Sequence, residues 1–332
     1  MKEEEIRPAA LFNQYLALAG KDIVTYFQDA PRISIPCPAC GSENHTSEFT
    51  KHDFSYVECR TCRTLFVNPR PDAESFSRYY TDSPSVRFWA THFYKETEKA
   101  RRELVIRPKA IMVRKLLDKY LNPLIRQPVV VDIGAGYGVF CEELSSLPGM
   151  SLSIMGIEPA TSLQEVCRQK KIKVIPKFLE ESSMDDLNGG HCAAATSFEL
   201  LEHLYDPGCF IRHCHTLLAD QGILILTTLS WDGFDLQVLR EKSRSISPPH
   251  HINFFNPHSL QLLLEKSGFT ILEVTTPGKL DVDIVTKQLQ DVNCNFIRML
   301  LSSGDPQTRE KFQEFLQSSL LSSHMMIVAR KE

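Results

Sequence analysis

The sequence predicts an α/β protein, in which helices cover both faces of a mostly parallel β-sheet and a small cysteine-rich unit precedes it. From residue 128 onward, apolar runs of four to eight residues alternate with amphipathic segments. Runs of this length are typical of buried strands, and their alternation with helices predicts right-handed β-α-β crossovers. Ahead of this region, two Cys-x-x-Cys pairs lie at residues 37–40 and 59–62. These pairs predict a second, smaller unit that the cysteines stabilise.

Composition limits the classes of partner. The chain has 332 residues, 42% of them hydrophobic, and a net charge of −4. This is enough apolar material for one main core and smaller units. Nucleic-acid binders usually carry a basic balance, so the charge argues against nucleic acid as a partner. No apolar run reaches the roughly 20 residues that span a bilayer, and the acidic N-terminus lacks a signal-peptide core. We therefore expect a cytoplasmic protein without a membrane span.

Changes of pattern divide the chain into five parts. Residues 1–36 hold one amphipathic helix, because apolar side chains recur there at helical spacing. The cysteine unit occupies 37–70, where turn residues and short β-prone pieces predict a small antiparallel hairpin. An aromatic, charged helical region follows at 71–122. The α/β core occupies 123–276, and 277–332 adds a helical excursion and a last strand, "SHMMIVARK".

The cysteine pairs predict a structural zinc site. Tetrahedral zinc takes four thiolates, and each Cys-x-x-Cys turn offers two of them. A site closed by four cysteines does no chemistry itself. Free thiols in a small β unit are the simpler interpretation, and a redox role is weaker because neither pair opens a thioredoxin-like helix. Gly41 follows the first pair, where the turn favours positive φ, whereas Arg63 follows the second. The predicted ligands are Cys37, Cys40, Cys59 and Cys62.

A glycine loop follows the first strand of the core. The stretch "VVVDIGAGYGVF" places Gly134, Gly136 and Gly138 between a strand and a helix, directly after Asp132. Glycines allow positive φ and close ligand approach, and the helix N-terminus adds free N–H groups. The dinucleotide fingerprint does not fit, because its third small residue falls on Val139. An acid at the strand end suits a ligand that carries a positive ammonium group.

A second acid ends the next strand. In "IMGIEPA", Glu158 lies at the carboxyl edge of the predicted sheet, 24 residues after Gly134. A carboxylate at this place accepts hydrogen bonds from the ribose hydroxyls of an adenosine cofactor. Alone, Glu158 could equally be a surface acid; the glycine loop upstream favours the binding role.

Three motifs in order, "VVVDIGAGYG", "GIEPA" and "TSFELLEHLYDP", resemble the class I S-adenosylmethionine-dependent methyltransferases. The resemblance covers roughly residues 125–276 and the final strand. It implies a Rossmann-like, seven-stranded sheet whose last strand is antiparallel. It also implies that the three glycines line the methionine and ribose part of the cofactor, that Asp132 faces the methionine ammonium and that Glu158 binds the ribose.

The same resemblance implies further contacts with the cofactor. A residue near the adenine is expected just after the strand "IKVIP", and the methionine end is expected beside the edge of the fourth strand. The predicted adenine neighbours are Phe178, Leu179 and Glu180, and the predicted methionine neighbours are Ser197, Phe198 and Glu199.

Three histidines are candidate catalytic bases. A hydroxyl or carbon acceptor loses a proton when it is methylated, and histidine suits that task near neutral pH. His203 follows an acid just past the fourth strand, where the family commonly has histidine. His250 and His251 lie in "SPPHHINFFNP", an irregular stretch after the fifth strand that is placed to overhang a substrate. A functionless surface pair is the alternative for these two.

The leading hypothesis is methyl transfer to an oxygen or carbon of a small-molecule or glycan-linked acceptor, with the cysteine unit and residues 71–122 as a cap. The cysteine unit and "LFVNPRPD" also resemble methyltransferases of bacterial sugar, polysaccharide and secondary-metabolite pathways. Amino methylation of bases is disfavoured, because the Asn/Asp-Pro-Pro-aromatic stretch typical of it is replaced by "TSFELLEH".

Two alternatives stay open. An RNA methyltransferase would use the zinc ribbon and the basic run "KARRELVIRPKA" for phosphate contact. That run also has a simpler interpretation as a solvated helix face, because nearby glutamates partly neutralise it. The second alternative is a non-catalytic scaffold that binds S-adenosylmethionine, against which the intact glycine loop and its two acids argue.

Overall fold

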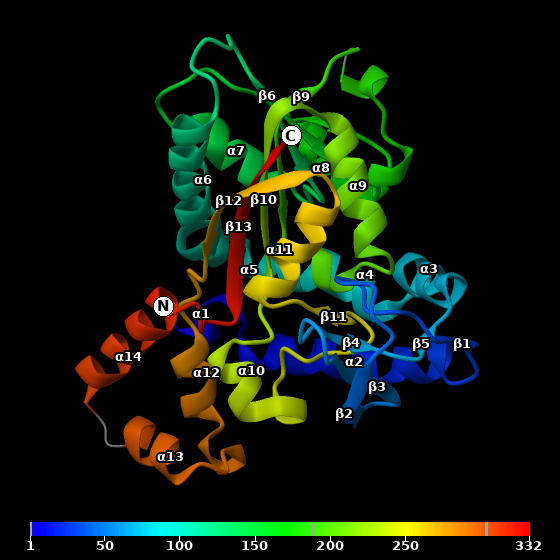
Figure 1. Cartoon of the computed structure of the whole chain (residues 1–332), viewed down its shortest axis with the longest axis vertical. Helices are drawn as coiled ribbons and strands as arrows, with labels where there is room; N and C mark the ends of the chain where they lie inside the picture. The colour runs from blue at the N-terminus through cyan, green and yellow to red at the C-terminus, as the bar shows by residue number, and fades with distance from the viewer. Residues whose placement is uncertain (1, 188, 303–304) are drawn as a thin grey trace.

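A seven-stranded sheet forms the centre of the computed structural model, which describes residues 2–187, 189–302 and 305–332. The strand order is β12-β13-β10-β9-β6-β7-β8 (Figure 1). Neighbours from β8 to β10 pair in parallel, whereas β13 is antiparallel to both β10 and β12. The predicted seven-stranded sheet with an antiparallel last strand is therefore confirmed. The strands are β6 (Val129–Ile133), β7 (Ser153–Ile157), β8 (Lys173–Ile175), β9 (Cys192–Phe198), β10 (Leu218–Leu229), β12 (Phe269–Thr275) and β13 (His324–Lys331).

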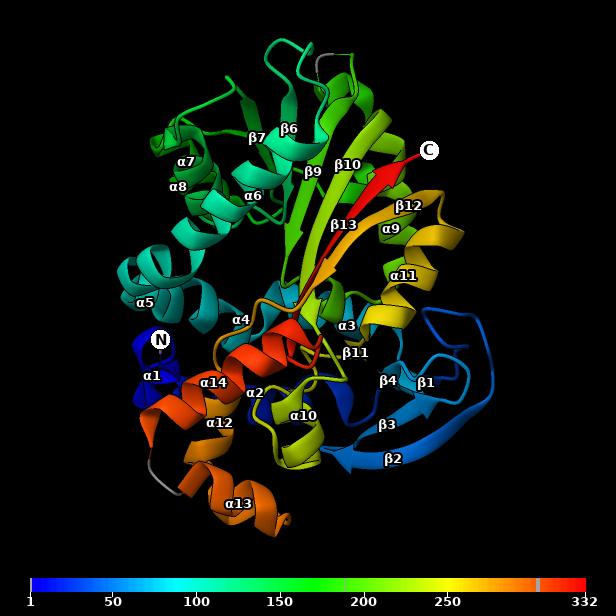
Figure 2. The same ribbon diagram turned by 60° about the vertical axis from the view of Figure 1, so that its left-hand side comes forward.

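Helices cover both faces of this sheet (Figure 2). Side chains of successive strand residues point to opposite faces, so a doubly covered strand is apolar throughout. Along β10, Ile223 and Ile225 pack with one set of helices, whereas Leu224 and Leu226 pack with the other. The helices are α6 (Arg107–Tyr120), α7 (Val139–Ser146) and α8 (Thr161–Gln169) on one side, and α9 (Pro207–Leu217) and α11 (Pro257–Lys266) on the other.

The cysteine unit shares a strand with the core. Its antiparallel sheet has the order β11-β4-β3-β2, where β11 (Asn253–Phe254) comes from the long segment after β10. Asn253 pairs with Phe66 and Phe254 with Leu65. The sequence predicts only a local hairpin here, because a two-residue strand has no periodicity to detect. The unit's other strands are β2 (His45–Lys51), β3 (Phe54–Cys59) and β4 (Leu65–Val67), and a separate ladder joins β1 (Arg32–Ile33) to β5 (Arg70–Pro71).

The N-terminal helices and the region after β5 lie across the lower end of the sheet in Figure 1. The expected first helix is α2, and a short α1 precedes it. The expected helical region runs almost without a break to α6, through two five-residue π-helical stretches, η1 and η2. Such wide turns are rare and are often found at functional sites. The elements are α1 (Glu3–Ile6), α2 (Ala9–Phe27), α3 (Ala73–Asp82), α4 (Pro84–Phe88), η1 (Trp89–Phe93), α5 (Tyr94–Arg101) and η2 (Arg102–Ile106).

The excursion between β12 and β13 holds several helices and its own small core. Leu239 of α10 packs with Val285 of α12 and with Leu301 and Leu316 of the two helices that follow. Within the described residues, no helix has both the length and the apolar character to cross a bilayer. The excursion holds α12 (Asp281–Lys287), the short 3-10 turn η7 (Leu289–Asp291), α13 (Asn295–Ser302) and α14 (Pro306–Ser318). The helix α10 (Phe234–Leu239) and the 3-10 turn η6 (Arg240–Lys242) come from the segment after β10, and α10 packs against α12.

Candidate active site and cysteine cluster

The glycine loop lies at the carboxyl end of β6. Gly134, Gly136 and Gly138 have φ values of +77°, +55° and +68°, which L side chains rarely adopt. The backbone N–H groups of Gly134 and Ala135 donate to the carbonyl of Ile157 at the end of β7, at 2.9 and 3.1 Å. A Cβ added at Gly136 would meet no described atom within 4 Å. The loop is therefore anchored to β7 and leaves open space beside its central glycine.

The carboxylate of Glu158 supports this loop. It is 7% exposed and accepts hydrogen bonds from the backbone N–H groups of Gly136 and Ala160, each at 2.9 Å. Burial raises the pKa of Glu158, and these two N–H groups oppose the shift. An ionised carboxylate has about four acceptor positions, so each oxygen keeps one for a further donor. This arrangement fits the predicted contact with two ribose hydroxyls.

Asp132 is buried beside the same loop. Its Oδ1 accepts a hydrogen bond from the hydroxyl of Thr196 at 2.7 Å. Burial raises the pKa of Asp132 to about 7, against the opposing effects of Thr196 and of the charge of Lys109. At the end of β9, the hydroxyl oxygen of Ser197 is buried and has no hydrogen-bond partner among the described residues. An acid that a cation would ionise and a free buried hydroxyl both fit the ammonium-bearing end of a cofactor.

The predicted adenine neighbours are placed differently from one another. The ring of Phe178 is 59% exposed beyond the end of β8, and Glu180 is exposed as well. Leu179 is 4% exposed and packs in the core, at the start of the 3-10 turn η3 (Leu179–Glu181). Phe178 therefore has a ring free to stack on a base, whereas the side chain of Leu179 is occupied by packing.

Glu199 takes part in an ion network. It has φ of +48°, a strained value for a residue with a side chain. Its carboxylate accepts from Thr227 at 2.7 Å, from Lys109 at 2.9 Å and from His324 at 2.5 Å. Partial loss of water opposes ionisation of this side chain, which is 40% exposed, yet the charges of Lys109 and His324 hold the pKa of Glu199 well below its ordinary value. Lys109 also lies 4.5 Å from the ring centre of Phe198. This predicted methionine neighbour is thus held by protein cations.

The three predicted histidines come together. The ring centres of His203 and His251 are 4.8 Å apart, and those of His203 and His250 are 5.7 Å apart. His203 belongs to the 3-10 turn η5 (Leu201–His203), directly after β9. The other two arrive from the segment that ends in β11, so the cluster joins two parts of the chain that are far apart in sequence.

Hydrogen bonds fix the tautomers of two of these rings. Nδ1 of His203 lies 3.0 Å from the carbonyl oxygen of His250, and Nδ1 of His251 lies 2.5 Å from that of Ser245. A carbonyl only accepts, so each Nδ1 carries the proton and each Nε2 keeps its lone pair. Burial lowers the pKa of His203 to about 4 and that of His251 to about 3. Both rings are therefore neutral near pH 7, which is the form that takes a proton.

Aromatic rings from the helical region surround His250. Its ring centre is 5.6 Å from Tyr15, 5.4 Å from Tyr79 and 5.9 Å from Tyr80. The Tyr79 hydroxyl lies 2.8 Å from Nε2 of His250, and Trp89 meets Tyr15 edge-on at 4.9 Å. The sequence shows that residues 73–121 are rich in aromatics, but no local signal links α2 or α3 to a histidine pair 170 or more residues later in the chain.

Glu202 adds a carboxylate to the histidine cluster. Ligand atoms of Glu202, His203 and His251 lie within 4.8 Å of one another, a donor set that could hold a divalent metal. Glu202 is 1% exposed and accepts from Thr228 at 2.7 Å. Burial, and then the charge of Glu199, raises the pKa of Glu202 to about 7.

The four cysteines also converge. The Sγ atoms of Cys37 and Cys62 are 3.5 Å apart, as are those of Cys40 and Cys59, and all four lie within 4.8 Å. Four thiolates at 2.3 Å from a tetrahedral zinc lie about 3.8 Å from one another, so the cluster fits this ion. Arg63 adopts φ of +61° and its N–H donates to Cys59, just as Gly41 does to Cys37. The second knuckle thus keeps its geometry in spite of the missing glycine.

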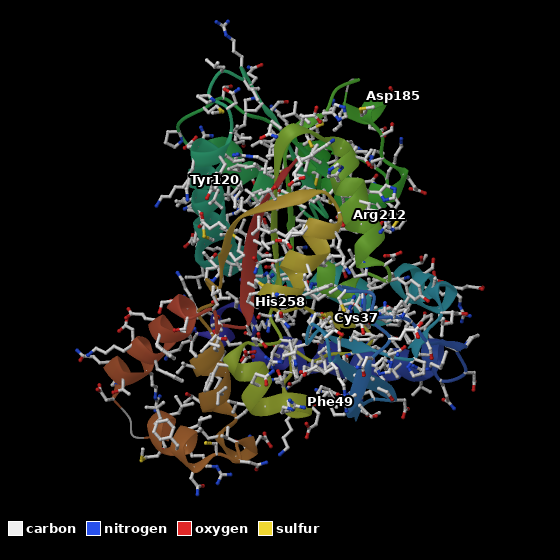
Figure 3. All side chains as sticks on the ribbon, in the orientation of Figure 1. Cys37, Phe49, Tyr120, Asp185, Arg212 and His258 are labelled. Atoms are coloured by element: carbon white, nitrogen blue, oxygen red, sulfur yellow. The ribbon has the colours of Figure 1, made fainter. Side chains whose placement is uncertain are left out.

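The cysteine cluster packs against the core near α11, since its cysteines share a hydrophobic cluster with Leu260 and Leu263, and Figure 3 shows Cys37 beside the lower end of that helix. The side-chain amide of Asn256, at the start of α11, donates to the carbonyl of Cys62 at 2.9 Å. Lys266, at the end of the same helix, donates to the carbonyl of Cys40 at 2.5 Å. Both knuckles are therefore tied to one helix of the core.

A family model described as a methyltransferase domain matches residues 103–274. The chain belongs to this methyltransferase family. Two relatives are ubiquinone biosynthesis O-methyltransferases. That of Haemophilus ducreyi is 25% identical over 194 residues, 52% of this chain and 77% of its own length. That of Xanthomonas axonopodis pv. citri is 30% identical over 156 residues, 44% of this chain and 64% of its own length.

Solved methyltransferase structures superpose in part. The magnesium protoporphyrin IX methyltransferase of Synechocystis PCC 6803 has a TM-score of 0.46 at 12% identity, over 80% of this chain and all of its own. The plantazolicin methyltransferase has a TM-score of 0.47 at 15% identity, over 74% of this chain and 93% of its own. The sequence match and the strand order together identify the chain as a class I S-adenosylmethionine-dependent methyltransferase. The cysteine unit lies outside the matched residues.

Proposed function

We propose that this methyltransferase transfers a methyl group to an oxygen or carbon of a small-molecule or glycan-linked acceptor, which binds among His203, His250 and His251. The observation that carries the proposal is the geometry of His203 and His251, whose Nδ1–H groups donate to carbonyls and leave each Nε2 with its lone pair inside the ring cluster. The relatives are O-methyltransferases, which favours oxygen over carbon.

The cofactor side of the site follows from the glycine loop. S-adenosylmethionine supplies an activated methyl group when bound. Glu158 would hold the ribose hydroxyls, Asp132 and the free hydroxyl of Ser197 would face the methionine end, and Phe178 would stack on the adenine. Gly136 supports this arrangement, because its missing side chain leaves open space beside the loop.

The acceptor side supplies alignment and a base. The acceptor hydroxyl would give its proton to Nε2 of His203 or His251 as its oxygen bonds to the methyl carbon. The bond between that carbon and the sulfonium sulfur would break, with S-adenosylhomocysteine as the leaving group. A positioned base of this kind contributes typically 10²–10⁴-fold in rate. The aromatic rings around His250 exclude water and present an apolar wall to the acceptor.

We also propose that the four cysteines hold a structural Zn²⁺. The spacing of the Sγ atoms supports this. A zinc held there stabilises β4, against which β11 pairs, and β11 follows directly after His250 and His251. The ion therefore acts at a distance from the chemistry, by fixing the segment that carries two of the histidines.

The basic run "KARRELVIRPKA" gives the RNA alternative less support than its sequence suggests. Arg102 and Arg107 pair with Glu143 of α7, at 2.7 and 2.8 Å, and Lys109 pairs with Glu199. These three cations are paired within the protein, so the run offers fewer free charges to a phosphate backbone than it has basic residues. A small acceptor and a cytoplasmic location remain our proposal.

The proposal is tested by incubating the protein with methyl-labelled S-adenosylmethionine and a panel of phenols, catechols and hydroxylated glycans. We expect label on an oxygen or carbon of at least one small acceptor, and none on RNA. Transfer to RNA alone, at a rate that falls steeply with salt, would favour the alternative.

A further inference from the structure

Two arginines beside the proposed site make no hydrogen bond to a carboxylate among the described residues, and the one ion pair, between Arg7 and Glu3, is long at 3.9 Å. Arg7 follows α1 and Arg101 ends α5, and these two helices pack against each other (Figures 1 and 2). The Nε atom of each arginine is shielded from solvent and has no hydrogen-bond partner in the described part of the chain. Two guanidinium groups are thus brought to the same side of the site with unused donors.

Arg7 lies beside the aromatic wall of the site. Its guanidinium carbon is 5.7 Å from the ring centre of Phe12, and that of Arg244 is 4.6 Å from the same ring. Phe12 stacks on Tyr15 at 5.9 Å, and Tyr15 meets the ring of His250 at 5.6 Å. The charge of Arg7 also contributes to the low pKa of His251. Arg7 is therefore an electrostatic neighbour of the proposed acceptor site.

Arg101 lies toward the cofactor loop. Its guanidinium carbon is 5.6 Å from the ring centre of Tyr94, which stacks at 4.5 Å on Tyr137 of the glycine loop. Burial lowers the pKa of Arg101, and the charge of Arg7 lowers it further. Because α1 packs against α5, the two arginines lie in the same region, Arg7 toward the histidines and Arg101 toward the loop.

The acids around the pair do not neutralise it. Glu3 approaches Arg7 only to 3.9 Å. Glu199 attracts Arg101, but its carboxylate is already bound by Lys109 and His324. Asp22, which acts on Tyr15, accepts from the N–H of Ser85 at 2.8 Å. Like charges that are partly withdrawn from water and only weakly paired are costly, and a bound anion reduces that cost.

We propose that Arg7 and Arg101 form an anion-binding subsite for a carboxylate or phosphate group of the methyl acceptor. The guanidinium fork matches both groups and forms charge-assisted hydrogen bonds with them. The acceptor class is then a small hydroxylated molecule with an acidic group, held at its acidic end while its hydroxyl reaches the histidines. This inference rests on the proposed methyl transfer.

The test uses benzoate and inorganic phosphate as probes, titrated into the full-length protein saturated with S-adenosylhomocysteine at constant ionic strength. We expect at least one anion to bind, and its dissociation constant to rise about tenfold or more in Arg7→Gln and in Arg101→Gln, the loss of a charged hydrogen-bond donor. Arg126→Gln is the matched control, since Arg126 is exposed in the loop before β6. Benzoate alone indicates a carboxylate acceptor, and phosphate alone a phosphorylated one.

Two results would overturn the subsite: neither anion binds, or both bind the variants as tightly as the native protein. Thermal unfolding shows whether Arg101→Gln is folded. If it is not, Arg101→Lys takes its place, because lysine keeps the charge but lacks the planar guanidinium group. This variant should bind the anion more weakly than the native protein does. Binding of S-adenosylhomocysteine separates the two proposals. If the native protein does not bind it, the methyl-transfer proposal fails; if it binds but no anion follows, only the subsite fails.

Discussion

The phenolic hydroxyl of Tyr56, in the cysteine unit, donates a hydrogen bond of 2.7 Å to the backbone carbonyl of His251. Tyr56 is fully buried in β3, two strands away from β11 in the shared sheet. The cysteine unit therefore holds the backbone of one proposed base directly, besides pairing with the strand that follows it. This relationship makes a metal-dependent position for His251 an expected property of the enzyme.

Removal of zinc should therefore lower the methyl-transfer rate more than it lowers cofactor affinity. A chelator strong enough to strip a four-cysteine site should release about one zinc per chain and loosen β4 and β11. Among the described residues, no hydrogen bond joins the glycine loop to the cysteine unit. The affinity for S-adenosylhomocysteine should therefore change little. Metal analysis and calorimetry on the same sample check this. Equal loss of both properties would indicate general unfolding instead.

Tyr56→Phe isolates the hydrogen bond from the metal. The variant leaves a buried carbonyl without its donor, which costs about 1–3 kcal/mol. We expect unchanged zinc content, unchanged cofactor binding and a reduced methyl-transfer rate. If the rate matches that of the native protein, the link between the two units is structural only.

His203→Ala and His251→Ala test the base. If one of them takes the proton, its loss should lower the rate by about 10²–10⁴-fold with cofactor affinity unchanged. His258→Ala is the control, because this exposed histidine, labelled in Figure 3, lies at the start of α11 and has no ring contact with the cluster in the described part of the chain. Because a pKa of about 4 or 3 leaves both rings neutral, the rate should not fall through histidine protonation between pH 8 and 5. A methyl-transfer rate that falls by half near pH 6.5 would contradict this, because it would indicate a base with the ordinary pKa of an exposed histidine.

Cofactor affinity should rise with pH through the titration of Asp132. Without the ammonium group of the cofactor beside it, this buried acid has a pKa raised to about 7, so it is largely protonated at pH 6. The ammonium group of the cofactor favours the ionised form, so binding at pH 6 must release a proton. Calorimetry with S-adenosylhomocysteine in two buffers of different ionisation heat counts that proton. Asp132→Asn should remove the pH dependence; if it persists, another group is responsible.

The free energy of unfolding should fall as the pH rises from about 4 to 7, through Asp235. Burial, and then the charge of Asp281, raises the pKa of Asp235 to about 7 in the folded protein, whereas about 3.9 is expected when unfolded. Between these values only the folded state keeps the proton, so its stabilising effect is lost as pH increases. Asp235→Asn should weaken this slope in denaturant unfolding at pH 5 and pH 8. The exposed Asp185 provides the control, Asp185→Asn, which should leave the slope unchanged.

Local patterns predicted what is local. The glycine loop, its two acids and the strands of the core were identified because glycine spacing, strand-end carboxylates and apolar run length are properties of short segments. The pairing of β11 with β4 was not predicted. It joins residues 65–66 to residues 253–254, and a pair of two-residue segments so far apart in sequence has no pattern to detect. Tyr15 and Arg7 were missed for the same reason, since only tertiary packing brings the first helices to His250 and His251. The ion network of Glu199 was also missed, because Lys109 and His324 come from opposite ends of the core.

The most direct test of the account is calorimetry of S-adenosylhomocysteine binding to the native protein and to Glu158→Ala. We expect micromolar-range binding to the native protein, the range in which KM values commonly lie, and a loss of about 1–3 kcal/mol in the variant, the cost of unpaired hydrogen-bonding groups. An intact folded protein that does not bind S-adenosylhomocysteine, or a variant that binds it as tightly as the native protein does, would contradict the assignment of this site.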